Sequence, residues 1–263
     1  MLKKLLKYDL KNIFKFLIIF YSLALFFGIL TRIVWGIENS FIMDVLGGIC
    51  SGTAISMMVS ILINNLMRLW VRFKSNFYGD ESYLTHTLPV NRKTLYLSKI
   101  LTGVITLFTS VIVIGLVLFI AYYSKENIEA LKNMLLPIAD IYGSTIIGIL
   151  LAFLFIFFLE FINALQAGYT GIVLGHKMNN AKTGFSVLYG FGTYIIIQVF
   201  VLLVVFITSL FNKDLMNLFF TNEIINIEVL KLVVYLTIII YIITFIINYF
   251  VNLKILKKGV DVE

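Results

Sequence analysis

The sequence predicts an all-α integral membrane protein with six membrane-spanning helices in a single transmembrane domain, residues 1–263. Of its residues, 60% are hydrophobic and only 13% are charged, whereas a soluble domain is usually about half apolar and about a quarter charged. A hydrocarbon core of about 30 Å takes about 20 apolar residues of helix, because backbone groups in lipid must be hydrogen-bonded within the segment. The stretches that qualify are 16–34, 49–69, 100–123, 141–165, 185–211 and 232–251.

Lysine and arginine residues are divided unequally between the two sides of the membrane. With both termini on one side, that side carries five cations in 1–15, six in 68–99, two in 177–182 and three in 254–258, which is 16 of 21. Because loops rich in lysine and arginine stay in the cytoplasm, we expect both termini to be cytoplasmic and the protein to lie in the cell membrane. Cations beside lipid headgroups also explain the net charge of +7 without nucleic acid as a partner.

The first 14 residues have the pattern of an amphipathic helix. Their apolar side chains recur at helical spacing, and the lysines fall on the other faces. The apolar set is Leu2, Leu5, Leu6, Leu10 and Ile13. We expect 1–14 to lie in the cytoplasmic interface and to bend like an elbow into the first span. The alternative is a plain basic flank that serves topology only.

The loop between the second and third spans, residues 77–99, is polar but has the signals of ordered structure. Gly79 can end the preceding helix, and Asp80 can cap a new one with Glu81 in its first turn. Pro89 disfavours helix at the residue before it, so the new helix ends there or earlier. Asn91 can then cap the helix that enters the third span.

The result is a short helix, 81–87, across the cytoplasmic end of a helical hairpin. Tyr78, Tyr83, Leu84 and Leu88 give it apolar contact area. A short exposed helix with aromatic residues suits insertion into a groove on another protein. The alternative is a loop that packs only on its own subunit.

The stretch YGDESYLTHTLPVNRKTLYLSK, residues 78–99, resembles the first cytoplasmic loop of ABC-2 type permeases, the membrane subunits of one class of bacterial ABC exporters. It is most similar to permeases of peptide-antibiotic export or resistance. The matching residues are Gly79, Asp80, Glu81, Tyr83, Leu84, Leu88, Pro89, Ser98 and Lys99. A second stretch, YTGIVLGHKMNN at 169–180, is similar to the segment that follows the fourth span in that family.

This resemblance implies that the loop carries a coupling helix seated in a groove of a cytoplasmic ABC ATPase. The residues expected to couple to the ATPase are Tyr78, Gly79, Asp80, Glu81, Tyr83, Leu84, Leu88 and Pro89. The chain contains no phosphate-binding G-x-x-x-x-G-K-[ST] motif, so we expect a non-catalytic subunit whose ATP and Mg²⁺ bind to a separate partner. Two ATPase copies and a second permease copy, or a close relative, would complete an exporter of an amphipathic peptide or lipid-like substrate.

Glu160, in LFIFFLEFINALQ, is the clear ionisable residue within a predicted span, which makes it a functional hypothesis by default. Asn163 and Gln166 follow at three-residue steps and could extend a polar stripe. We interpret Glu160 and Asn163 as candidates for the substrate pathway, where the carboxylate could meet a cationic part of a substrate or pair with a partner helix. The alternative is a structural carboxylate near the cytoplasmic end.

Small and polar residues recur at every fourth position of the second span. The row consists of Gly48, Gly52, Ser56, Ser60, Asn64 and Arg68. Small residues at this step let helix backbones approach closely, so we interpret the first four as a helix-packing seam. The row drifts by about 40° per step around the helix, and we assign Asn64 and Arg68 to a cytoplasmic opening of the substrate pathway.

The outer segments contain no stretch large enough for a receptor domain. Pro137 and Asp140 indicate a capped start of the fourth span, and the amphipathic segment 212–231 is expected to form a short helix or hairpin at the outer interface. Cys50 stands alone, and neither His86 nor His176 has a carboxylate at ligand spacing, so no metal site is expected.

The main alternative function is a secondary transporter or channel driven by an ion gradient. That class predicts discontinuous spans broken by glycine or proline and repeated halves, and neither pattern is found in this sequence. An intramembrane enzyme would need a catalytic partner for Glu160 at matching depth, and a purely structural scaffold remains a third alternative.

Overall fold

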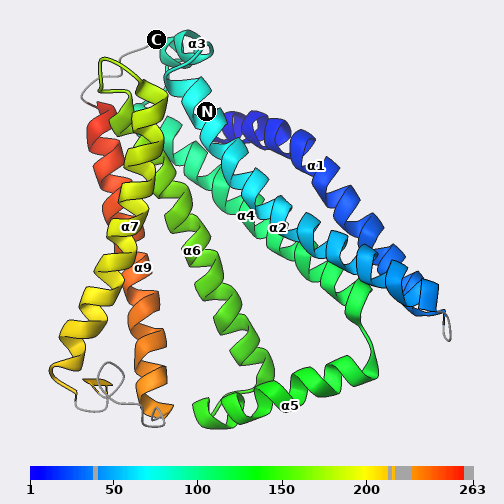
Figure 1. The fold of residues 1–263 in the computed structure, drawn as a ribbon. Coiled ribbons are helices and arrows are strands. Elements are labelled where there is room, and N and C mark those ends of the chain that lie inside the picture. Colours follow the sequence, from blue (N-terminus) through cyan, green and yellow to red (C-terminus); the bar gives the residue numbers. More distant parts are fainter. Residues whose placement is uncertain (38–40, 213–214, 217–226, 258–263) are drawn as a thin grey trace. The chain divides into compact units, whose positions relative to one another are not determined.

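The structure, a computed structural model, describes residues 1–37, 41–212, 215–216 and 227–257. In these residues the regular elements are all helices, and six of them are long and apolar enough to cross a membrane (Figure 1). Their bounds are α1 Leu2–Trp35, α2 Phe41–Phe77, α4 Arg92–Tyr122, α6 Ile146–Gly175, α7 Lys182–Ser209 and α9 Ile227–Lys257. Each predicted span overlaps one of these helices, which confirms the all-helical fold with six long apolar helices as candidate membrane spans.

Two shorter helices connect the long ones. α3, Ser82–Thr87, lies between α2 and α4, and α5, Lys125–Tyr142, lies between α4 and α6. The predicted start of the fourth span is wrong, because Pro137 lies inside α5 instead of marking a new helix. α6 begins at Ile146, where the Thr145 hydroxyl accepts a hydrogen bond from the Gly148 backbone N–H at 3.1 Å. Most of the predicted outer segment 212–231 lies outside the described residues.

The chain forms two compact units. The N-terminal unit contains residues 1–76 and 83–131, and the C-terminal unit contains residues 77–82 together with the chain from 132 onward. The loop between α2 and α4 therefore contributes residues to both units.

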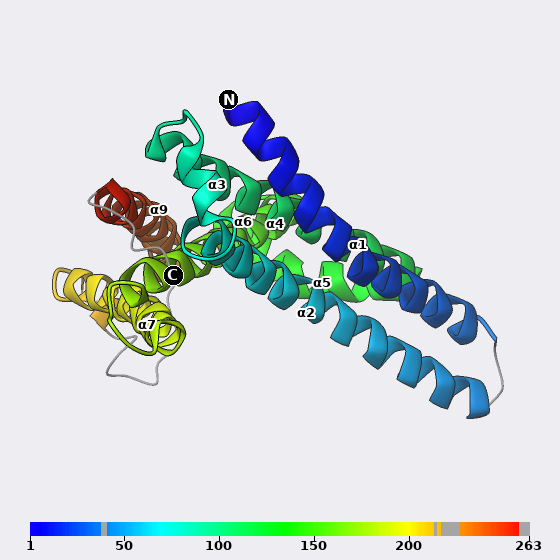
Figure 2. The same cartoon turned by 90° about the horizontal axis from the view of Figure 1, so that it is seen from above.

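In the N-terminal unit, α1 packs along α4, as both views show (Figures 1 and 2). The two helices approach so closely at Gly28 that a Cβ there would lie 3.0 Å from Val117 Cγ1. The Ser110 hydroxyl on α4 is within 2.8 Å of the Tyr21 hydroxyl on α1 and accepts a hydrogen bond from Asn65 Nδ2 on α2 at 2.9 Å. This buried polar group therefore joins three helices.

The segment 1–14 is the first part of the continuous helix α1, which curves along its length in Figure 1. Its lysines are exposed, and Leu5, Leu6 and Leu10 are half-buried, in agreement with the predicted amphipathic pattern. Its position in the membrane interface stays a prediction.

In the C-terminal unit, α6 packs against both α7 and α9. The α6–α7 contact depends on small residues four apart, Gly171 and Gly175 on α6 against Ser186 and Gly190 on α7. A Cβ at Gly171 would overlap the backbone of Gly190, and one at Gly175 would overlap Ser186. Such pairs let helix backbones come close enough for dispersion contacts along both helices.

We expect Gly171→Ala to destabilise the fold, because the added methyl group would overlap backbone atoms that cannot rotate away. Overpacking of this kind costs about 1–3 kcal/mol, so the midpoint of thermal unfolding in detergent should fall by several degrees. The matched control is Gly192→Ala on α7, where a Cβ would meet no atom within 4 Å. Equal midpoints for the two variants would contradict the close approach.

Candidate functional site

The loop between α2 and α4 begins with a tight turn. The Ser82 backbone N–H donates a hydrogen bond to the Gly79 carbonyl at 2.8 Å, and Asp80 is exposed on this turn. α3 begins at Ser82 and has no acidic residue in its first turn, so the predicted placement of Glu81 inside the helix is wrong by one residue.

The far end of the loop agrees with the sequence prediction. Asn91 has extended backbone angles, and its side chain accepts a hydrogen bond from the Lys93 backbone N–H at 3.4 Å, so it caps α4 as expected. α3 ends at Thr87, ahead of Leu88 and Pro89. The interval between α3 and α4 is therefore four residues long.

The predicted coupling residues differ in exposure: Tyr78 is buried, Gly79 and Glu81 are half-buried, and the others are exposed. Tyr83 and Leu84 are 68% and 73% exposed, Leu88 is 42% exposed, and Pro89 is also exposed. Tyr78 is buried, with its ring stacked on the His176 ring at a centroid distance of 4.2 Å. The exposed set can therefore meet another protein, whereas Tyr78 serves packing.

The Tyr78–His176 stack lies within the C-terminal unit. His176 ends α6, and its Nδ1 is 2.8 Å from the Ile172 carbonyl, which fixes the plane of the ring. Sequence reasoning did not pair these residues, although each lies in one of the two stretches that resemble the permease family. The loop is thus anchored to the end of α6 by an aromatic contact.

A buried ion pair joins α1 to α4 in the N-terminal unit. Lys99 Nζ donates to the two carboxylate oxygens of Asp9 at 2.8 and 2.6 Å, and it also donates to Asn76 Oδ1 on α2. Arg72 Nε lies 3.4 Å from the same carboxylate. Sequence reasoning counted Lys99 among the cytoplasmic cations and among the residues that match the permease loop, but it did not pair it with Asp9, which is the lone acid among the lysines of the first 15 residues.

Asn64 and Arg68 make contacts within the N-terminal unit. Asn64 Nδ2 donates to the Ser60 carbonyl of its own helix at 2.9 Å. Arg68 donates to Asn12 Oδ1 on α1 at 3.0 Å, and its guanidinium lies 5.4 Å from the centre of the Phe16 ring. These contacts hold α2 to α1, and a role of the two residues in a substrate pathway stays a prediction.

The small-residue row of α2 meets no helix of this chain at its glycines. A Cβ at Gly48 or Gly52 would have no atom within 4 Å, and Ser56 is exposed while Ser60 is partly buried. At Gly48, Gly52 and Ser56 the helix surface is therefore not covered by another described helix. Close helix contacts in the described residues are made instead at Gly28 of α1 and at the glycines of α6 and α7. A search for small residues four apart could have found the contact between α6 and α7.

Glu160 lies midway along α6 and bonds to α7. Its Oε1 accepts hydrogen bonds from the Tyr194 hydroxyl and from Gln198 Nε2, the latter at 2.8 Å. Its Oε2 is buried and accepts no hydrogen bond from the described residues. Sequence reasoning identified the carboxylate but not these partners, because they are 34 and 38 positions away in the chain.

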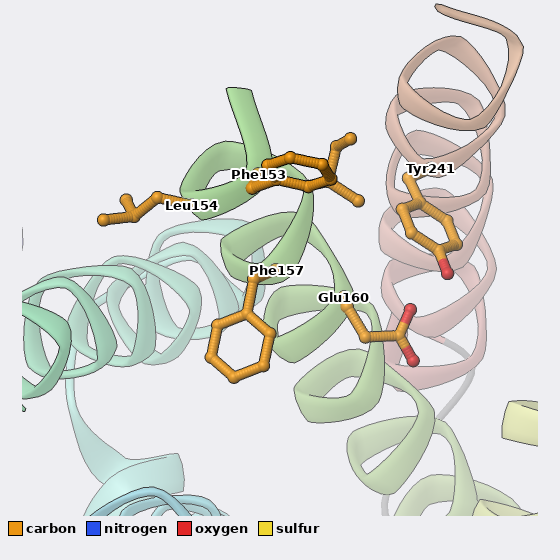
Figure 3. Close-up of a pocket in the computed structure, with 6 residues that line it drawn as sticks. Phe153, Leu154, Phe157, Glu160 and Tyr241 are labelled. Carbon is orange, nitrogen blue, oxygen red and sulfur yellow. The ribbon is translucent and has the colours of Figure 1, made fainter. Parts of the chain in front are cut away.

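Glu160 also lines a pocket of about 500 Å³ (Figure 3). The other lining residues are Phe153, Leu154, Ile156, Phe157 and Tyr241. The close-up shows the Tyr241 hydroxyl and the Glu160 carboxylate turned toward each other. The pocket therefore combines one carboxylate with apolar and aromatic walls.

Asn163 and Gln166 form hydrogen bonds to α9 and do not line the pocket of Glu160. Asn163 Nδ2 donates to the Tyr241 carbonyl at 3.1 Å and its Oδ1 accepts from the Thr244 hydroxyl at 2.9 Å. Gln166 Nε2 donates to the Phe245 carbonyl at 3.2 Å. Both side chains are fully buried, so these contacts hold α9 against α6. A pathway role of Asn163 stays a prediction.

No group of three or more histidine, cysteine, aspartate or glutamate residues that could hold a metal ion occurs in the part of the chain that the structure describes. Comparisons with known protein families, curated proteins and solved structures give no match for this chain. The class that the fold defines is a multi-pass membrane protein with six candidate membrane-spanning helices.

We expect the Asp9–Lys99 pair to be strongly coupled. Asp9→Leu removes the carboxylate from the buried Lys99, and Lys99→Met leaves Asp9 with only the longer contact to Arg72. Because breaking a buried pair costs about 3–5 kcal/mol, each variant should lower the midpoint of thermal unfolding markedly, Asp9→Leu the more so. The double variant should recover much of the loss, because no unpaired charge of the pair then remains. Strictly additive losses would contradict the coupling, and Lys11→Met, at an exposed position of α1, is the control.

Proposed function

We propose that this chain is the membrane-spanning permease subunit of an ATP-driven exporter, coupled through the loop between α2 and α4 to a separate cytoplasmic ATPase. The observation that carries the proposal is the exposure of Tyr83, Leu84 and Leu88 on and beside a six-residue helix. Large apolar side chains on a short helix that joins two spanning helices are suited to docking into a groove of another protein.

The loop between α2 and α4 is fixed by contacts at its start and at its end, as an element that transmits motion requires. At its start, the Gly79–Ser82 turn and the Tyr78–His176 stack fix its backbone. At its end, Asn91 caps α4, and about two turns further along that helix Lys99 is paired with Asp9 of α1. A displacement of α3 would therefore move α2 and α4 instead of being taken up by a flexible loop.

In the proposed mechanism, two permease copies, or this chain and a close relative, form the pathway above two ATPases. ATP and Mg²⁺ bind to the ATPases, and this chain performs no chemistry. Closure of the ATPases moves α3, and the motion passes into α2 and α4 as a rigid-body transition. The ion pair between Lys99 and Asp9 would carry the same motion to α1.

The transported substrate is proposed to be amphipathic, either a peptide or a lipid-like molecule, moved out of the cytoplasm. This rests on the resemblance of the loop and of residues 169–180 to permeases of peptide-antibiotic export or resistance, together with the apolar interior of the helices. In the proposed orientation both termini are cytoplasmic, and residues 1–14 lie along the cytoplasmic interface.

An ion-gradient-driven transporter is the second candidate, and Glu160 is the observation that favours it, because intramembrane carboxylates often mark ion pathways. Transporters of that class frequently contain spans that are broken near the membrane centre. Here each of the six long helices is continuous over its described length, and the proline that the structure places inside a helix belongs to α5. These features favour the ATP-driven exporter.

The decisive experiment is affinity capture of the full chain from native membranes, followed by measurement of ATP hydrolysis in liposomes. We expect an ATP-binding protein to co-purify with the wild type, and Tyr83→Ala/Leu84→Ala to lower its recovery about tenfold or more, as loss of buried apolar anchors does at interfaces.

The matched control is Tyr8→Ala, since Tyr8 on α1 has the same exposed fraction as Tyr83, 68%. The control should leave ATPase recovery unchanged. The exporter proposal fails if no ATP-binding protein associates with the wild type under mild solubilisation, or if Tyr8→Ala reduces recovery as much as the loop variant does.

A further inference from the structure

The negative charge of Glu160 has no cationic partner in the described part of the chain. Its hydrogen-bond donors are a hydroxyl and an amide, both neutral, and both act on Oε1. The ion pairs of Asp9 with Lys99 and Arg72 belong to the other unit. A carboxylate midway along a spanning helix is costly unless a counter-charge compensates it.

The second carboxylate oxygen strengthens this argument. Oε2 is buried and accepts no hydrogen bond of normal length from the described residues, and the hydroxyl turned toward the carboxylate, that of Tyr241, is neutral. An ionised carboxylate accepts hydrogen bonds at both oxygens, and an unmet acceptor in apolar surroundings costs free energy. The site is therefore incomplete in charge and in hydrogen bonding on the same functional group.

The walls of the neighbouring pocket favour one chemical class of ligand. Three aromatic rings, those of Phe153, Phe157 and Tyr241, line it together with Leu154 and Ile156 (Figure 3). The faces of aromatic rings attract cations, most strongly when the cation is poorly hydrated. A carboxylate surrounded by aromatic rings thus selects a positive charge that is carried on an apolar body.

We infer that this pocket between α6 and α9 is a binding site for a lipophilic cation, such as a quaternary or protonated amine with aromatic or long alkyl substituents. The cation lies beside Glu160 and supplies the missing counter-charge, while its apolar body contacts Phe153, Leu154 and Phe157. A pocket of about 500 Å³ lies within the range of small-molecule sites. The pocket belongs entirely to the C-terminal unit, and its residues are separate from the loop that contacts the ATPase in the proposed function.

Binding of such a cation does not depend on an ATPase, and only the view of this pocket as the substrate site rests on the proposed function. The negative charge of the pocket distinguishes it from a general apolar groove. An uncharged lipid tail would gain nothing from Glu160, and an anion of the same size would be repelled by it.

The test uses the purified full chain in lipid nanodiscs and a matched pair of probes, tetraphenylphosphonium and tetraphenylborate, which have similar size and opposite charge. Equilibrium dialysis against empty nanodiscs removes the contribution of the lipid. We expect saturable binding of the cation above the lipid background and none of the anion.

Variants then assign the binding to this pocket. Glu160→Gln keeps the shape of the side chain and should weaken cation binding about tenfold or more, because the charge is lost. Phe157→Leu keeps the apolar volume and should weaken it several-fold, because the ring face is lost. Glu129→Gln on the exposed face of α5 removes an equal charge outside the pocket and should leave binding unchanged.

The inference is overturned if the wild type binds no more cation than empty nanodiscs do, if both probes bind equally, or if Glu160→Gln and Glu129→Gln bind like the wild type. An equal loss for the two glutamate variants would also overturn it, because net charge would then explain the effect. Unfolding midpoints of all variants separate loss of the site from loss of the fold. Failure here leaves ATPase capture by the loop untouched, and failure of ATPase capture leaves this binding untouched.

Discussion

In an apolar membrane interior, polar side chains have only one another and the backbone as partners, and the packing of this chain follows from that constraint. Ser110 is shared by Tyr21 and Asn65 and so joins α1, α2 and α4. Asn163 bonds to the backbone and side chains of α9. Apolar side chains give little preference for one helix over another in lipid. The few polar contacts and the glycine contacts therefore specify which helices are neighbours.

The same constraint separates structural polar residues from functional ones. Asn163 has its amide nitrogen and its oxygen occupied and is fully buried, which is the condition of a packing residue. Glu160 lies three positions earlier and has one oxygen occupied and the other without a donor in the described residues. A residue that the protein leaves incompletely paired at a pocket is suited to a ligand, and this difference separates two neighbours that look alike in the sequence.

The loop between α2 and α4 combines rigidity with an exposed apolar surface. Its backbone is fixed by the Gly79–Ser82 turn and by the Asn91 cap, and its exposed residues are concentrated on α3 and just after it. A flexible loop would lose a pushing force, whereas a loop anchored at both ends can pass it on. The buried pair of Asp9 and Lys99 binds α4 to α1 with a contact that is costly to break.

Local sequence was sufficient to predict the features that depend on residues close together in the chain. The six spans follow from run length and hydropathy, and the cap at Asn91 follows from Asn at the start of a helix after proline. The start of α6 was misplaced, since a proline inside α5 and a threonine cap give similar local signals. Glu160 was identified by its charge alone, but its partners Tyr194 and Gln198 come from another helix.

By itself, the sequence determined that this is a membrane protein with six apolar helices and a structured polar loop, because those properties depend on composition and on signals a few residues apart. Only the tertiary structure decided that Asp9 pairs with Lys99, that Tyr78 is buried against His176, and that Glu160 lacks a counter-charge in the described residues. The two pairings join residues many positions apart, and the surroundings of Glu160 likewise come from other helices. In lipid, hydrophobicity does not select them, since the tails surrounding the helices are as apolar as the helices themselves.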